Sequence, residues 1–203
     1  MKQAALPPSS RSLSLLSAPL RALCAAAVLL AAGAAHADDY ADVNGLLRAG
    51  KSTEALSKAD AYIQANPRDP QMRFLRGVIL SEQGKQSEAQ AAFTQLTQDY
   101  PELPEPYNNL AAIYAGQGQF DKARDALESA VRLNPHYATA HENLGDVYAR
   151  LAAQQYAKAQ QYASTSASVA PKLALVRQVF DKSADGAALP AAPSAPPRAV
   201  RNR

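Results

Sequence analysis

The chain has 203 residues, of which 21 are Lys or Arg, 18 are Asp or Glu and 47% are hydrophobic. The first 37 residues hold three bases and no acid, so the rest of the chain carries 18 bases and 18 acids. This balance excludes a strongly basic working chain and so argues against nucleic acid as a partner.

The first 37 residues have the order of a cleavable secretory signal. Three bases ending at Arg21 precede an apolar run over residues 22–32, and small residues stand at both places of a cleavage site, Ala35 and Ala37. The run is shorter than the ~20 apolar residues that a membrane-spanning helix needs. We therefore expect cleavage after Ala37, a mature chain without an integral membrane span, and export to a bacterial periplasm.

The single cysteine, Cys24, lies inside this apolar run. The residues before it lack the leucine-then-small order of a lipobox, so a lipid-anchored N-terminus is the lesser alternative. After cleavage the chain contains no cysteine, and an oxidising compartment offers it no disulfide. Its stability must then come from packing.

A period of 34 residues runs through the rest of the chain. Prolines recur at this spacing: Pro67, Pro101 and Pro135. An alanine lies twelve residues before each of them: Ala55, Ala89 and Ala123. Such a period is typical of stacked units, each of which buries its apolar face only against its neighbours.

Two segments within this repeating pattern indicate the type of repeat. Residues 107–114 (YNNLAAIY) and 141–148 (HENLGDVY) resemble the first helices of tetratricopeptide (TPR) repeats. The resemblance implies an all-α, right-handed solenoid of about four helix-turn-helix repeats, which lie at about residues 38–69, 70–103, 104–137 and 138–171. Small residues should let the two helices of a repeat cross closely. These are Gly77, Ala111 and Gly145 on the first helices, and Ala89, Ala123 and the corresponding alanine on the second helices. We expect a left-handed glycine at the end of each of three first helices: Gly50, Gly84 and Gly118.

The fourth repeat departs from this pattern. Pro171 follows Pro135 by 36 residues, and no glycine marks a turn after Tyr148. We interpret this as a two-residue insertion within residues 151–155 that lengthens the turn between the two helices. Residues 172–183 resemble the capping helix that closes a TPR stack.

Residues 184–203 are rich in Ala and Pro, and we expect them to be disordered. Residues 38–172 hold 13 bases and 16 acids, whereas residues 173–203 hold 5 bases and 2 acids. This tail can therefore be attracted weakly to acidic groove residues or to an anionic envelope component. A merely solubilising tail is the preferred interpretation.

The mature sequence offers no recognisable catalytic, cofactor or metal site. Its only histidines are His136 and His141, and it has no phosphate-binding glycine loop and no G-x-S-x-G motif. His141-Glu142 begins like the zinc motif H-E-x-x-H but lacks the second histidine. We therefore predict a protein that is not an enzyme and uses no cofactor or metal.

The resemblance further implies a concave groove, lined by the first helices, that binds an extended segment of a protein or peptide. Amide side chains both donate and accept, which suits a peptide backbone, while Phe74 and Tyr40 offer apolar contact. The groove-facing residues implied are Tyr40, Asn44, Phe74, Val78, Asn108, Asn109, Ala112, Glu142, Asn143 and Asp146.

Some TPR proteins hold C-terminal carboxylates with a clamp that includes bases, but this chain does not match that pattern. Only Asn44 fits, because the other clamp places are occupied by Tyr40, Leu75, Glu105 and Asn109. The sequence thus predicts a periplasmic, non-catalytic TPR adaptor. The alternative is an accessory subunit that positions a cell-envelope enzyme in cell-wall or outer-membrane assembly; a hydrolase is disfavoured.

Overall fold

The computed structural model describes residues 39–162 and 167–181. The predicted signal segment and the tail 184–203 lie outside these residues. All regular structure in the described ranges is helical. Residues 39–48 are helical, and the following helices are α2 (Ser52–Ala65), α3 (Pro70–Glu82), α4 (Gln86–Asp99), α5 (Pro104–Gly116), α6 (Phe120–Leu133), α7 (Ala138–Tyr162) and α8 (Val169–Asp181).

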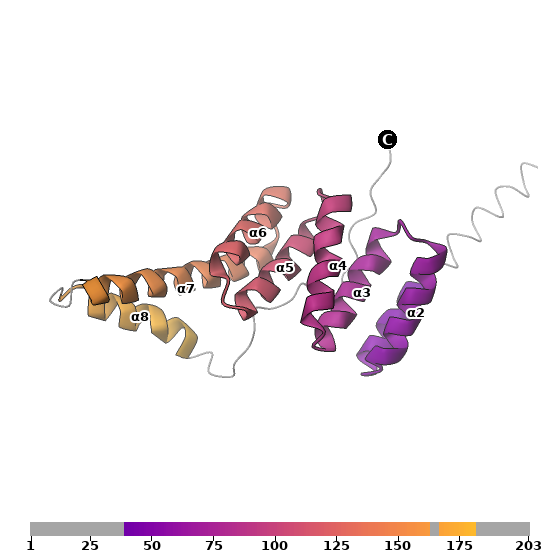
Figure 1. Cartoon of the computed structure of the whole chain (residues 1–203), viewed down its shortest axis with the longest axis horizontal. Helices are drawn as coiled ribbons and strands as arrows, with labels where there is room; N and C mark the ends of the chain where they lie inside the picture. Colours follow the sequence, from indigo (N-terminus) through magenta and orange to yellow (C-terminus); the bar gives the residue numbers. More distant parts are fainter. Residues whose placement is uncertain (1–38, 163–166, 182–203) are drawn as a thin grey trace, which may run out of the picture. The chain divides into compact units, whose positions relative to one another are not determined.

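Helices that follow one another in the sequence pack against each other from α2 to α8 (Figure 1). The first helices α5 and α7 of neighbouring pairs also touch. This arrangement confirms the all-α TPR solenoid. Within the described ranges, no helix combines the length and the apolar character needed to cross a membrane.

Aspartate and proline set where two of the first helices begin. The Asp69 carboxylate accepts hydrogen bonds from the backbone N–H groups of Gln71 at 2.9 Å and Met72 at 3.1 Å, which caps α3. Pro70 and Pro104 fill the first positions of α3 and α5, where no backbone N–H is needed. The chain therefore enters these helices at fixed points.

Glycine ends the helix 39–48 and the helices α3 and α5. Gly50, Gly84 and Gly118 have φ angles of 71°, 73° and 72°, in the left-handed region that other residues rarely adopt. After Gly84, the N–H of Lys85 donates back to the carbonyl of Leu80 at 2.9 Å, which satisfies one of the last carbonyls of the helix. The predicted role of these three glycines is confirmed.

The expected turn within residues 151–155 is wrong. α7 is a single helix of 25 residues that runs through this segment. No glycine follows Tyr148 to end the helix, and the segment is rich in alanine, the strongest helix former. α8 packs against α7 as the second helix of this pair and buries Leu173. It begins at Val169 and so includes most of the predicted capping helix.

The packing around the crossing glycines also differs from expectation. Phe93 of α4 lies against Phe74 of α3, with ring centroids 5.6 Å apart. A Cβ atom added to Gly77 would lie only 2.6 Å from Cε1 of Phe93, so this glycine makes room for an aromatic ring rather than for Ala89. Nothing lies within 4 Å of the same atom at Gly145, so the close crossing expected there is not present.

Candidate functional site

The ten predicted groove residues divide into buried and accessible ones. Five are buried: Phe74, Val78, Asn108, Asn109 and Asn143. Five are at least partly accessible: Tyr40, Asn44, Ala112, Glu142 and Asp146. Phe74 and Val78 are 1% and 6% exposed and belong to the apolar core between α3, α4 and α5. The expectation that Phe74 offers its ring to a partner is corrected, because the core already uses it. Peptide contact by the accessible five stays a prediction.

One face of α5 carries side chains spaced three or four residues apart, namely Glu105, Asn109, Ala112 and Gly116. The side chain of Asn109 is only 3% exposed, and its Nδ2 donates to the backbone carbonyl of Glu105 at 3.0 Å. Ala112 is half-buried and small. An extended backbone can therefore approach this face closely.

Asn108 points away from that face toward α7. Its Oδ1 accepts a hydrogen bond from Nδ2 of Asn143 at 2.9 Å, and both residues are 0% exposed. The bond joins the first helices of two neighbouring pairs. Asn108 and Asn143 therefore form a contact between helices in this structure, and the expected direct contact of both residues with a peptide is corrected.

Several buried polar atoms of this region have no hydrogen-bond partner among the described residues. They include Nδ2 of Asn108, Oε2 of Glu105 and the hydroxyl of Tyr137. Glu105 precedes Asn108 by three residues on α5, and Tyr137 immediately precedes α7. We refer to Glu105, Asn108, Tyr137 and Asn143 as the Glu105 site. Unpaired buried polar groups cost free energy and are rare in native proteins, so they need an explanation.

The electrostatics of the Glu105 site reflect this burial. Desolvation raises the pKa of the Glu105 carboxyl above its ordinary value. The pKa of the Tyr137 phenol is raised as well, first by burial and then by the charge of Glu105. No ion pair within the described residues gives the carboxylate a stabilising positive charge.

The surroundings of the site on these two helices are acidic. α5 contains one acid and no Lys or Arg, while residues 138–149 of α7 contain Glu142 and Asp146 and again no Lys or Arg. The first base on α7 is Arg150, whose guanidinium lies over the ring of Phe120 at 5.6 Å. This face favours a partner segment of positive charge.

Glu105 and Tyr137 are site residues that the sequence interpretation missed. From the sequence, Glu105 is noted only because it occupies a position where the carboxylate clamp has a different residue. A comparison of the repeats could have indicated both residues. Gln71 and Thr139, the residues equivalent to Glu105 in the neighbouring repeats, are uncharged. Leu103 is the residue equivalent to Tyr137 one repeat earlier. An acid and a phenol thus replace less polar or uncharged residues at the starts of two neighbouring first helices, α5 and α7.

Another surface of the described chain, around Arg73, contains two depressions and a paired charge. Two adjoining depressions of 570 and 420 Å³ share Arg73 and Gln95. Arg73 pairs with Asp99 on α4 at 2.6 Å and also lies over the ring of Tyr100 at 5.7 Å. Arg73 and Asp99 on this surface are thus paired with each other, whereas the Glu105 site contains polar atoms without a hydrogen-bond partner.

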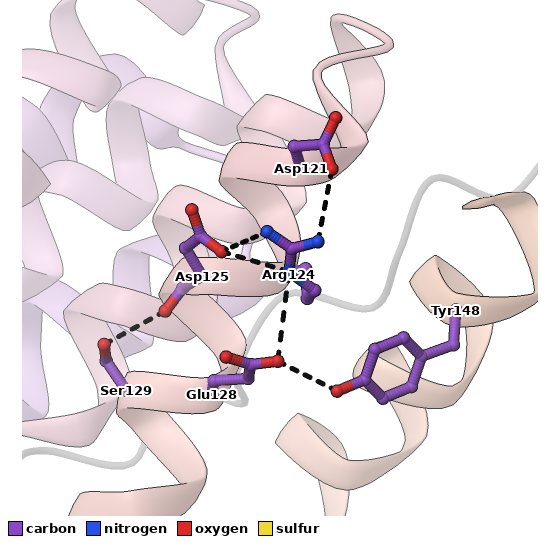
Figure 2. A network of polar contacts seen from close by, with 6 residues as sticks. All are labelled: Asp121, Arg124, Asp125, Glu128, Ser129 and Tyr148. Atoms are coloured by element: carbon purple, nitrogen blue, oxygen red, sulfur yellow. Dashed lines mark hydrogen bonds and ion pairs between the residues drawn. The ribbon is translucent and has the colours of Figure 1, made fainter.

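A second charged network links α6 to α7 (Figure 2). The Arg124 guanidinium lies 3.2 Å from the Asp121 carboxylate, 2.7 Å from Asp125 and 3.9 Å from Glu128. The Tyr148 hydroxyl donates to Glu128 at 2.9 Å. The network is largely exposed and connects the surfaces of α6 and α7. In the ranges that the structure covers, no group of His, Asp and Glu side chains is placed to hold a metal ion.

Comparisons with known proteins agree with the repeat pattern. A family model described as tetratricopeptide repeat matches residues 40–104, and one described as TPR repeat matches residues 113–151. No curated protein sequence matches the chain.

Two solved structures have a similar fold. The first TPR of Spaghetti (RPAP3), bound to the HSP90 peptide SRMEEVD, matches 55% of this chain and 88% of its own, with a TM-score of 0.52 and 19% identity. The second TPR domain of human RPAP3, in complex with the HSP70 peptide SGPTIEEVD, matches 54% of this chain and 92% of its own, with a TM-score of 0.50 and 18% identity. At these identities the likeness concerns the fold.

Proposed function

Because the chain belongs to the tetratricopeptide repeat family, we propose that it is a non-catalytic adaptor that binds an extended segment of a protein partner along α5 and α7. The observation that carries the proposal is the set of unpartnered buried polar atoms in the Glu105 site. Both TPR domains of similar fold were solved with bound peptides, which supports this use of the scaffold.

Peptide binding needs hydrogen-bonding groups that the fold has not already used, together with room for a backbone. The Glu105 carboxylate and the Tyr137 hydroxyl each keep an oxygen without a hydrogen-bond partner. Ala112 is small enough to let a peptide backbone approach, while Glu142 and Asp146, one helical turn apart on α7, add acceptors nearby. A partner segment therefore gains hydrogen bonds along both helices.

We further propose that the adaptor works in a bacterial periplasm after removal of residues 1–37. The order of bases, apolar run and small residues ending at Ala37 supports this location. N-terminal sequencing of the exported protein should give Asp38 as the first residue. A mature protein that keeps residues 22–32 would instead indicate a membrane anchor.

Site-specific photo-cross-linking of the full chain in cells tests the adaptor proposal. A photoreactive phenylalanine analogue at Glu142, which is exposed on α7, should cross-link a partner polypeptide. The same analogue at Gln98, which is exposed on α4, should not. Equal cross-linking from both positions, or from Gln98 alone, would contradict the proposal.

A further inference from the structure

The Glu105 carboxylate is the one group of the Glu105 site that carries a charge, and the described chain provides no counter-charge for it. Its Oε2 is buried without a hydrogen-bond partner, and neither α5 nor residues 138–149 of α7 contain a Lys or Arg. The arginines of the neighbouring helices pair with other carboxylates, as Arg73 does with Asp99 and Arg124 with the acids of α6. A desolvated carboxylate in this state is unfavourable until a cation reaches it.

The groups around Glu105 determine what kind of cation fits. The Tyr137 hydroxyl has no hydrogen-bond partner and can accept a hydrogen bond from a cationic N–H group. A lysine or arginine side chain suits both this hydroxyl and the carboxylate, because it offers several N–H donors. An acidic segment would instead place a second negative charge beside Glu105.

Access to the site needs a local movement of the Glu105 and Tyr137 side chains, whose unpartnered oxygens are buried. Both residues are half-buried rather than fully buried, and Ala112 on the same helix as Glu105 is small. The last torsion of a glutamate side chain is broad, so the carboxyl group can turn Oε2 toward solvent. Glu142 and Asp146 add a negative potential over the same face, which raises the local concentration of a basic segment.

We propose that the Glu105 site binds a lysine or arginine side chain of the partner segment, with the Glu105 carboxylate as its anionic acceptor and with the Tyr137 hydroxyl as a flanking acceptor. This inference rests on the proposed function, because it names the chemistry of the segment that the adaptor binds. It also reverses the preference of a carboxylate clamp, since an acid stands here where a clamp requires a base.

The probe is a random heptapeptide library displayed on phage and selected on the immobilised full chain. The selected peptides should carry Lys or Arg at one fixed position. The Glu105→Gln variant should bind a selected peptide about tenfold more weakly, the usual effect of losing one hydrogen bond to a charged group. Glu102→Gln, which changes an exposed acid three residues earlier, is the matched control and should leave the affinity unchanged.

A second measurement ties the effect to one contact. Replacing the fixed Lys of the selected peptide by norleucine should weaken its binding to the wild type by the same factor. The same replacement should not weaken binding to Glu105→Gln any further. Peptides selected without a basic preference, or equal affinity of Glu105→Gln and wild type, would overturn the inference but leave the adaptor proposal standing. If the wild type selects no peptide at all, the adaptor proposal fails and the inference fails with it.

Discussion

Nδ2 of Asn143 on α7 donates to Oδ1 of Asn108 on α5 at 2.9 Å, and solvent reaches neither residue. The bond links first helices of neighbouring pairs through residues 35 positions apart in the sequence. Asn109 occupies the place equivalent to Asn143 but bonds to the carbonyl of Glu105 within its own helix. The same residue type at the same repeat position thus makes two different contacts.

Removal of the inter-helix amide should destabilise the fold. Asn143→Ala leaves Oδ1 of the buried Asn108 without its donor, so we expect a loss of ~1–3 kcal/mol in the free energy of unfolding. A double-mutant cycle with Asn108→Ala, measured by urea titration, should show a coupling of about 0.5–3 kcal/mol between the two residues. An unchanged urea midpoint for Asn143→Ala would show that the bond contributes nothing to stability.

Two glycines of the first helices, Gly77 and Gly145, should respond in opposite directions to alanine. Gly77→Ala places a Cβ atom against the ring of Phe93, and the overpacking should cost ~1–3 kcal/mol. Gly145→Ala adds a methyl group where nothing lies within 4 Å, and alanine in a helix interior should stabilise by ~0.5–1 kcal/mol. Thermal unfolding of both variants measures the difference. Equal effects of the two changes would contradict this packing.

The parts of the fold that depend on local residue chemistry were predictable from the sequence. Gly50, Gly84 and Gly118 adopt the left-handed turn that only glycine adopts easily, so their role follows from residue type and spacing. The continuous helix α7 was not predictable from the period, because counting a repeat presumes a turn where the sequence provides no residue that breaks a helix.

The site was predictable only in part. Consecutive helix residues lie about 100° apart around the axis, so the repeat register cannot decide whether Asn108 faces a groove or the next helix. The charge of Glu105 on α5 raises the pKa of Tyr137, the residue before α7, so these two residues influence each other across the fold. Periodicity carries no information on such a non-local pair, whereas the accessible acids Glu142 and Asp146 follow directly from it.

The Glu105 carboxyl should make the stability of the protein depend on pH. Desolvation raises its pKa in the folded state above the unfolded value, so the folded state holds this proton more tightly. Stability should therefore fall as the pH rises from the ordinary glutamate pKa through the raised one. Urea titrations over this range should show wild type losing stability relative to Glu105→Gln as the pH rises. A pH-independent difference between the two proteins would contradict the unpaired, desolvated carboxylate.

Tyr137→Phe should separate binding from stability. The change keeps the packed ring and removes a hydroxyl without a partner, so the free energy of unfolding should stay unchanged or rise by up to ~1 kcal/mol. Affinity for a selected Lys peptide should fall. The control is Tyr62→Phe, which removes a hydroxyl bonded to Asp69 at 3.1 Å and should cost ~0.5–1.5 kcal/mol. A loss of stability in Tyr137→Phe as large as in the control would mean that the Tyr137 hydroxyl has a structural partner.

The most direct test of the working surface is an NMR titration of the full chain, labelled with ¹⁵N, with a heptapeptide from the phage selection. We expect the largest amide shifts on α5 around Glu105 and Ala112 and on residues 137–146. We also expect the pKa of the Glu105 carboxyl to fall when the peptide binds, because a bound cation stabilises the carboxylate. Shifts centred instead on Arg73 and Asp99, with the Glu105 carboxyl unaffected, would contradict this prediction.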